Sequence, residues 1–155
     1  MCCKHFAAYD TEGLCGTIPR FSNDATVTAR DFWETYMPAF HACVVEAQAS
    51  HVMCAYNAVN GVPSCANPGL LNEILRDQWN FTGFVVGDYD AWAFLKDQQQ
   101  VADTYVEAAA MGIVAGIDQE VRRQTTRHVT ARKTTLTMPL PCHYTTFVTV
   151  LRHET

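Results

Sequence analysis

The sequence lacks an apolar run long enough to cross a membrane, and it lacks the basic-then-apolar opening of a secretion signal. It has no internal repeat and no excess of positive charge over most of its length. Residues 1–120 hold 5 Lys and Arg against 15 Asp and Glu, a net charge of −10. An acidic body matches the phosphate backbone of nucleic acid poorly. These absences argue against a membrane protein and against a nucleic-acid-binding protein.

The last part of the chain differs from this body. Residues 121–155 hold 6 Lys and Arg against 1 acid, a net charge of +5, with ten Thr and no clear period before residues 147–151. This composition favours a poorly ordered extension. We therefore expect one domain over residues 1–120 and a Thr/Arg-rich tail over residues 121–155. Binding of the tail to nucleic acid or to an anionic membrane is the less favoured interpretation.

The cysteine content is high for a cytosolic protein. There are seven cysteines, and Asn80 opens the one Asn-x-Thr glycosylation triplet. Both features favour an oxidising compartment, and an odd number of cysteines leaves at least one thiol without a partner in the chain. Cys54 and Cys65 are a plausible pair that closes a loop.

Two other uses of cysteine are less favoured. A zinc cluster fits no common ligand spacing, so no metal ion and no cofactor are expected. Its members would be Cys2, Cys3, His5, His51 and Cys54. Catalysis by the Cys54 thiol with His51 is disfavoured as well, because residues three apart on a strand point to opposite faces.

Short apolar segments alternate with amphipathic ones along residues 1–120. The pattern predicts strands over residues 2–8, 51–56 and 84–86, with a fourth beginning at residues 116–118. Apolar residues at steps of three and four predict helices over residues 32–47, 70–79 and 101–115. Thr28 and Asp31 have the spacing of a capping box before the first helix. Parallel strands require crossovers, so the alternation predicts an α/β fold with a parallel sheet.

Polar and aromatic residues lie in or just beyond three of these strands. Lys4 and His5 belong to the first, Tyr56 ends the second, and Asp88 follows the third with Trp92 nearby. Ligands of parallel α/β folds bind beyond the carboxyl ends of the strands. A cation, an imidazole, a carboxylate and aromatic rings at one rim suit a neutral polyhydroxylated ligand such as a sugar. Taken alone, Asp88 is also consistent with a helix cap or a loop acceptor.

Three segments, in order and at about the expected spacing, resemble signatures of glycoside hydrolase family 3. They are Cys3-Lys4-His5-Phe6 with Ala8-Tyr9-Asp10, the stretch from Val52 to Cys65, and Gly83-Phe84-Val85-Val86-Gly87-Asp88. Residues 31–40 and 70–79 are also similar to the family. The similarity covers about residues 2–120 and is closest to the β-xylosidase and arabinofuranosidase branch, with β-glucosidases next.

The resemblance implies a partial (β/α)8 barrel of about four C-terminal strand–helix units. It implies that Asp88 is the catalytic nucleophile, which forms a covalent glycosyl-enzyme and gives retention of configuration. Lys4 and His5 would hold hydroxyls of the sugar next to the cleaved bond. The residues expected to bind substrate are Lys4, His5, Met53, Tyr56 and Trp92. For Tyr56 and Trp92, packing roles are about equally favoured.

The implied activity is hydrolysis of terminal β-glycosidic bonds in carbohydrate catabolism, such as xylan breakdown, by a secreted enzyme. The implied partner is an oligosaccharide or glycoside. The family usually takes its general acid/base from a later domain, and its early barrel strands would precede Cys2, so we expect a fragment of a longer extracellular enzyme. Asp90, Asp118 and Glu120 match no acid/base motif. The alternative is a catalytically incomplete, sugar-binding remnant.

Two positions beside the expected nucleophile depart from the family pattern. Gly87 stands where the family usually has Ser, and Tyr89 stands where the xylosidase branch often has Cys. The change at Tyr89 weakens the assignment to the xylosidase branch.

Overall fold

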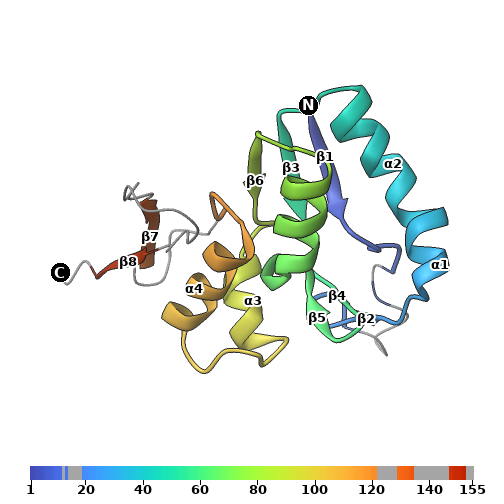
Figure 1. Ribbon diagram of the computed structural model, residues 1–155. Coiled ribbons are helices and arrows are strands. Elements are labelled where there is room, and N and C mark those ends of the chain that lie inside the picture. Colours follow the sequence, from blue (N-terminus) through green and yellow to red (C-terminus); the bar gives the residue numbers. More distant parts are fainter. Residues whose placement is uncertain (12, 14–18, 122–128, 135–146, 153–155) are drawn as a thin grey trace.

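A parallel sheet lies at the centre of the computed structural model, which describes residues 1–11, 13, 19–121, 129–134 and 147–152 (Figure 1). The sheet contains β1 (Cys2–Phe6), β3 (His51–Cys54) and β6 (Phe84–Val86), in the order β1–β3–β6. Both pairings are parallel. Val86 also forms a parallel bridge with Gln119, so a fourth segment runs beside β6. The chain therefore has the predicted α/β character.

Helices connect these parallel strands. Between β1 and β3 the chain forms one continuous helical run, and between β3 and β6 it forms a short 3-10 helix followed by a π-helix. The first run contains α1 (Ala29–Asp31), η1 (Phe32–Tyr36), α2 (Met37–His41) and η2 (Ala42–Glu46); the second contains η3 (Ser64–Ala66) and η4 (Gly69–Gln78). In Figure 1 the run containing α1 and α2 lies beside β1. As predicted, Thr28 caps the first run by accepting a hydrogen bond from the Asp31 backbone N–H at 3.1 Å.

Two helices follow β6. The predicted helix over residues 101–115 is observed as α4 (Tyr105–Ala115), because Thr104 caps it by accepting a hydrogen bond from the Glu107 backbone N–H. The sequence pattern did not predict α3 (Ala91–Asp97), which is only 7 residues long and so shows less than two turns of apolar periodicity. No helix in the described part of the chain is both long and apolar enough to span a membrane.

Two smaller sheets accompany the central one. β2 (Asp24–Ala25) pairs in parallel with β4 (Ala58–Val59), which pairs antiparallel with β5 (Val62–Pro63). In the tail, β7 (Val129–Thr134) and β8 (Phe147–Arg152) form an antiparallel pair. Residues 122–128, 135–146 and 153–155 lie outside the described residues, so the poor order expected for most of the tail stays a prediction.

The core lies between the central sheet and its helices. Cys3, Val52 and Val85 are aligned across the three strands and are nearly inaccessible, as expected for a face covered by helices. Phe6 is fully buried, with ring centroids 4.9 Å from Phe40 and 5.9 Å from Trp79. The neighbouring set of aligned residues is more exposed to solvent. Its member on β6, Phe84, is 41% exposed. The sheet is therefore well covered on one side only, among the described residues.

One partly buried ion pair fixes the fourth segment to β6. Arg76 on η4 lies 2.7 Å from an oxygen of Asp118, and the same oxygen accepts a hydrogen bond from the Val85 backbone N–H at 2.8 Å. Arg76 also donates to the carbonyl oxygens of Gly83 and Gly116. Asp118, one of the carboxylates without a matching motif, thus serves to hold strands together.

Two disulfides close the chain on itself. Cys54 pairs with Cys65, as predicted, and Cys3 pairs with Cys43. These bonds show that the alternative of a zinc cluster through Cys3 and Cys54 is wrong, because a disulfide sulfur has no thiolate to donate. The alternative of a catalytic Cys54 thiol is wrong for the same reason. In the described part of the chain, no group of three or more His, Cys, Asp or Glu is arranged to hold a metal ion.

The two disulfides are expected to differ in their effect on stability. Cys54 and Cys65 are 11 residues apart, whereas Cys3 and Cys43 are 40 apart. Because a longer closed loop removes more entropy from the unfolded chain, C54A/C65A should lower the free energy of unfolding by roughly 3 kcal/mol and C3A/C43A by roughly 4 kcal/mol. Urea unfolding checks this, with C2A at the exposed Cys2 as the neutral control. A larger loss for C54A/C65A would contradict it.

Candidate active site

His5 and Asp88 meet at the carboxyl end of the central sheet. Asp88 follows β6 directly after Gly87, and His5 belongs to β1, two strands away. The His5 Nε2 and the Asp88 Oδ2 are 3.3 Å apart, and the two side chains are 24% and 13% exposed. The structure thus brings together two residues 83 positions apart, both of which the sequence singled out.

Asp88 is held by the backbone around it. Its Oδ1 accepts a hydrogen bond from the Tyr89 N–H at 2.7 Å, and its carbonyl oxygen accepts one from the Ala91 N–H at 2.9 Å. Its Oδ2 is buried and accepts no well-aligned hydrogen bond from the described residues. One oxygen of the carboxylate is therefore fixed by the chain, while the other lies beside His5.

Asn57 ties the ends of β1 and β3 together. This side chain is fully buried, and its Nδ2 donates to the carbonyl oxygens of Ala7 and Ala8 at 3.2 and 3.1 Å. The Ala55 N–H adds a bond to the Phe6 carbonyl at 2.9 Å. A buried amide that satisfies backbone carbonyls in this way rigidifies the loops that it joins. Asn57 therefore supports the position of His5.

Tyr56 lies beside Asp88 and is only 6% exposed. Its hydroxyl donates to the carbonyl oxygen of Tyr89 at 2.8 Å. Burial raises the pKa of the Tyr56 hydroxyl well above the usual value, and the negative charge of Asp88 raises it further. Tyr56 is therefore a neutral hydrogen-bond donor throughout the physiological pH range.

An aromatic wall surrounds Tyr56. We use this name for Tyr9, Phe21 and Phe94, whose ring centroids lie 6.1, 5.0 and 5.4 Å from that of Tyr56. The ring of Tyr9 also meets that of His5 edge-on at 5.4 Å. Aromatic rings of this kind offer apolar faces on which sugar rings stack.

Arg20 and Gln99 hold the aromatic wall in place. The Arg20 Nε donates to the Tyr9 hydroxyl at 2.7 Å, and its guanidinium lies 5.4 Å from the centroid of the Tyr56 ring. The Gln99 amide donates to the carbonyl oxygens of Tyr56 and Phe21. The loop that carries Phe21 is thereby fixed to the end of β3.

The other predicted binding residues are placed differently. Lys4 in β1 is exposed and forms no hydrogen bond or ion pair with the described residues, so His5, rather than Lys4, is the side chain beside Asp88. Met53 is half-buried and aligned with Val86 in the neighbouring strand. Trp92 is 9% exposed, and its indole packs so closely on α4 that a Cβ at Gly112 would collide with it. This position favours a packing role for Trp92 over sugar stacking.

The sequence pattern did not single out most of the aromatic wall and its supports. Tyr9 belongs to a segment that resembles a family motif, while Arg20 and Phe21 lie in an irregular loop without apolar periodicity. Phe94 and Gln99 lie within or just after α3, the helix that was not predicted. Among the residues of the aromatic wall, Tyr9 is the one that a sequence motif indicates.

A comparison with protein families matches residues 1–137 to the family described as the glycosyl hydrolase family 3 N-terminal domain. Among curated proteins, probable β-D-xylosidase 7 of Arabidopsis thaliana is 46% identical over 117 residues. The β-xylosidase/α-L-arabinofuranosidase 2 of Medicago sativa subsp. varia is 43% identical over 117 residues. Each match covers 76% of this chain and 15% of the relative, so the chain spans about 15% of the length of these relatives.

The solved structures that are similar to this chain include a β-xylosidase and a β-glucosidase. A family 3 exo-β-xylosidase in complex with a xylobiose aziridine activity-based probe matches with a TM-score of 0.74 and 39% identity. The match covers 77% of this chain and 16% of that one. A β-glucosidase from Listeria innocua matches with a TM-score of 0.67 and 32% identity, over 77% of this chain and 16% of that one.

The raised pKa of Tyr56 predicts a loss of stability at alkaline pH. Below about pH 10, the ordinary pKa of tyrosine, the contribution of Tyr56 to stability is fully present. Above it, the unfolded chain ionises at Tyr56 while the folded chain stays protonated, so the free energy of unfolding should fall by up to about 1.4 kcal/mol per pH unit. Urea unfolding at about pH 9 and about pH 11 should show a smaller fall in Y56F than in the unsubstituted chain. Equal falls would contradict the prediction.

Proposed function

Because the chain belongs to glycosyl hydrolase family 3, we propose that it carries the nucleophile-bearing part of a retaining β-glycosidase. The observation that carries the proposal is the 3.3 Å approach of His5 to Asp88 at the carboxyl end of a parallel sheet. The substrate would be a glycoside or oligosaccharide with a terminal β-linked xylose or glucose. The xylosidase and glucosidase names of the similar proteins support these two sugars.

In the proposed reaction Asp88 is the nucleophile. One oxygen of its carboxylate forms a bond to the anomeric carbon while the bond from that carbon to the leaving oxygen breaks. Water then hydrolyses the glycosyl-enzyme, so the configuration is retained. A second carboxyl group about 5–5.5 Å away would protonate the leaving oxygen and later activate the water. We propose that it comes from a part of the enzyme outside the residues described.

His5, Lys4, Tyr56 and Met53 form the proposed sugar subsite. His5 would bind a hydroxyl of the sugar while it neighbours Asp88, and the exposed ammonium of Lys4 would bind a second hydroxyl. Tyr56 and the aromatic wall would face the apolar side of the ring. The Tyr56 hydroxyl, which is already bonded to the Tyr89 carbonyl, would hold the loop after Asp88 in place.

The fold around this site is proposed to be part of a (β/α)8 barrel, with about four strand–helix units over residues 1–120 and residues 121–155 outside it. Four parallel segments joined by helices and covered on one side support this proposal. The two disulfides support an extracellular location for the full-length enzyme, because such bonds persist in oxidising compartments.

A second function is a sugar-binding remnant without catalysis. It is favoured because Asp90, Asp118 and Glu120 match no acid/base motif of the family. The two functions share the subsite and differ in whether Asp88 forms a bond to the sugar. A measurement of hydrolysis therefore distinguishes the two functions, whereas a measurement of sugar binding does not.

The test uses the oxidised chain with xylobiose and with an aryl β-xyloside. Calorimetry should detect xylobiose binding, which H5A weakens by roughly tenfold, the loss expected when a hydrogen bond to a ligand is removed. Release of the aryl group should fall by a factor on the order of a thousand or more in D88N, as for removal of a nucleophile. D103N, which changes an exposed aspartate away from the site, is the matched control.

Each result decides between the two functions. Aryl release that is lost in D88N and kept in D103N supports the glycosidase. Binding of xylobiose without aryl release supports the remnant. Neither binding nor release in the folded chain would overturn both.

A further inference from the structure

Gly87, immediately before Asp88, has no room for a side chain. A Cβ built at Gly87 would collide with the Oε2 of Glu120 and would lie 3.3 Å from its Cδ. The backbone of Gly87 is not in the left-handed region, so its conformation does not require glycine. The Glu120 carboxylate therefore occupies the space that a side chain at position 87 would fill.

The other oxygen of Glu120 caps the helix that follows Asp88. Its Oε1 accepts a hydrogen bond from the backbone N–H of Trp92 in the first turn of α3, at 2.9 Å. Asp90, at the N-cap position of this helix, makes no capping bond with its own side chain. Glu120, 28 positions after Trp92, thus supplies the capping acceptor. Its negative charge interacts favourably with the N-terminus of α3.

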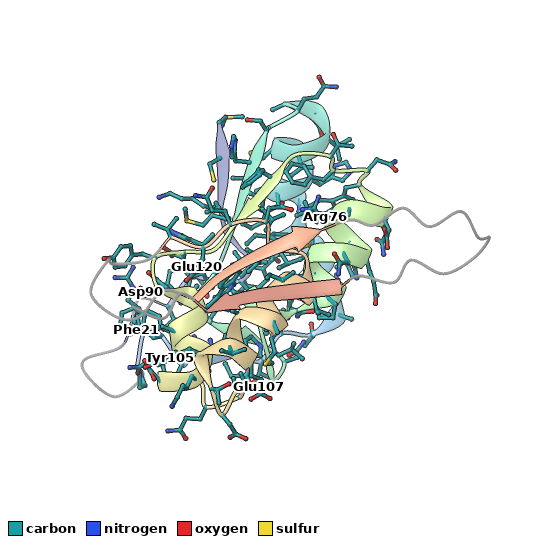
Figure 2. All side chains as sticks on the ribbon, turned by 90° about the vertical axis from the view of Figure 1, so that its left-hand side faces the viewer. Phe21, Arg76, Asp90, Tyr105, Glu107 and Glu120 are labelled. Carbon is teal, nitrogen blue, oxygen red and sulfur yellow. A yellow bond between two sulfur atoms is a disulfide. The ribbon has the colours of Figure 1, made fainter. Side chains whose placement is uncertain are left out.

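The backbone around Glu120 holds the same loop. The Gly87 N–H donates to the Gln119 carbonyl at 2.8 Å, and the Asp90 N–H donates to the Val121 carbonyl at 2.7 Å. Figure 2 shows Glu120 and Asp90 near one another, whereas Glu107 lies farther away on α4. Asp88 therefore sits in a short loop whose two flanks, Gly87 and Trp92, both meet one carboxylate.

We propose that Glu120 is a positioning residue for Asp88 and that Gly87 and Glu120 form a size-matched pair. Glu120 fixes the loop from Gly87 to Trp92 and so sets where the Asp88 carboxylate lies relative to His5. A larger residue at position 87 would displace the Glu120 carboxylate from this place. The catalytic consequence rests on the proposed glycosidase function, whereas the positioning of Asp88 itself does not.

The pair is tested by a double-variant cycle in urea unfolding. G87A should raise the unfolding equilibrium constant roughly tenfold, because Glu120 must leave the Trp92 N–H, and E120D should raise it roughly fivefold. In G87A/E120D the shorter carboxylate leaves room for the new methyl group, so the effect should be about that of E120D alone. If the effects of G87A and E120D on the unfolding equilibrium constant multiply in the double variant, the proposal of a size-matched pair is overturned.

A matched control separates positioning from simple helix capping. Glu107 caps α4 by accepting a hydrogen bond from the Asp103 N–H at 2.9 Å, away from Asp88. E107D should lower stability to a similar extent, and its effect should multiply with that of G87A.

Nuclear magnetic resonance reports the position of Asp88 directly, without any sugar. The Tyr89 amide signal depends on its hydrogen bond to the Asp88 Oδ1. This signal and the ring signals of His5 should move in E120D and G87A, and they should stay in place in E107D. If E120D lowers stability and leaves these signals unchanged, Glu120 is only a structural residue and the proposal is overturned.

Xylobiose affinity then tests the consequence for function. E120D should weaken binding several-fold while E107D leaves it unchanged. A chain in which the amide signals move as expected but no sugar binds would contradict the proposed function and leave the positioning role standing. Unchanged affinity in E120D, in a chain that does bind xylobiose, would show that the loop position does not matter to the subsite.

Discussion

Parallel pairing of β1, β3 and β6 is the constraint on which the site depends. Parallel strands end at the same edge of the sheet, so residues just beyond them meet although the chain between them is long. This brings the His5 imidazole to 3.3 Å from the Asp88 carboxylate. Three features keep these strand ends in register. They are the helices between the strands, the hydrogen bonds from the Asn57 amide to the backbone after β1, and the Arg76–Asp118 ion pair.

The site is built from residues that act through one another. Asp88 is fixed by the Tyr89 amide on one side and lies beside His5 on the other. The Tyr56 hydroxyl donates a hydrogen bond to the Tyr89 carbonyl in the same loop. Because its pKa is raised, this hydroxyl stays neutral beside the Asp88 carboxylate. The proposed chemistry needs this separation, because a nucleophilic carboxylate must stay ionised while its neighbours donate hydrogen bonds.

Much of the fold followed from the sequence because its strands are short apolar runs and its helices show strong periodicity. The positions of Asp88, His5 and Tyr56 at strand ends followed from the same pattern. The helix α3 did not, since 7 residues carry too little periodicity to identify it. The roles of Asn57, Arg20 and Glu120 depend on contacts between residues distant in the chain, which no local pattern records.

Trp92 illustrates the limit of inference from proximity along the chain. It lies four residues after Asp88, which made a sugar platform plausible, but the first turn of α3 turns its indole toward Gly112 on α4. The rings that do surround Tyr56 come instead from an irregular loop and from later in α3. Residues adjacent in sequence point in directions that only the helix geometry decides.

The central claim is that the Asp88 carboxylate forms a covalent bond to a sugar, and peptide mass mapping tests it most directly. An aryl β-xyloside whose leaving group is acidic enough to depart unprotonated makes the attack independent of a second carboxyl group. The chain should gain the mass of one xylosyl group, located at Asp88 and absent in D88N. A xylosyl group on another residue, or none in a folded chain that binds xylobiose, would contradict it.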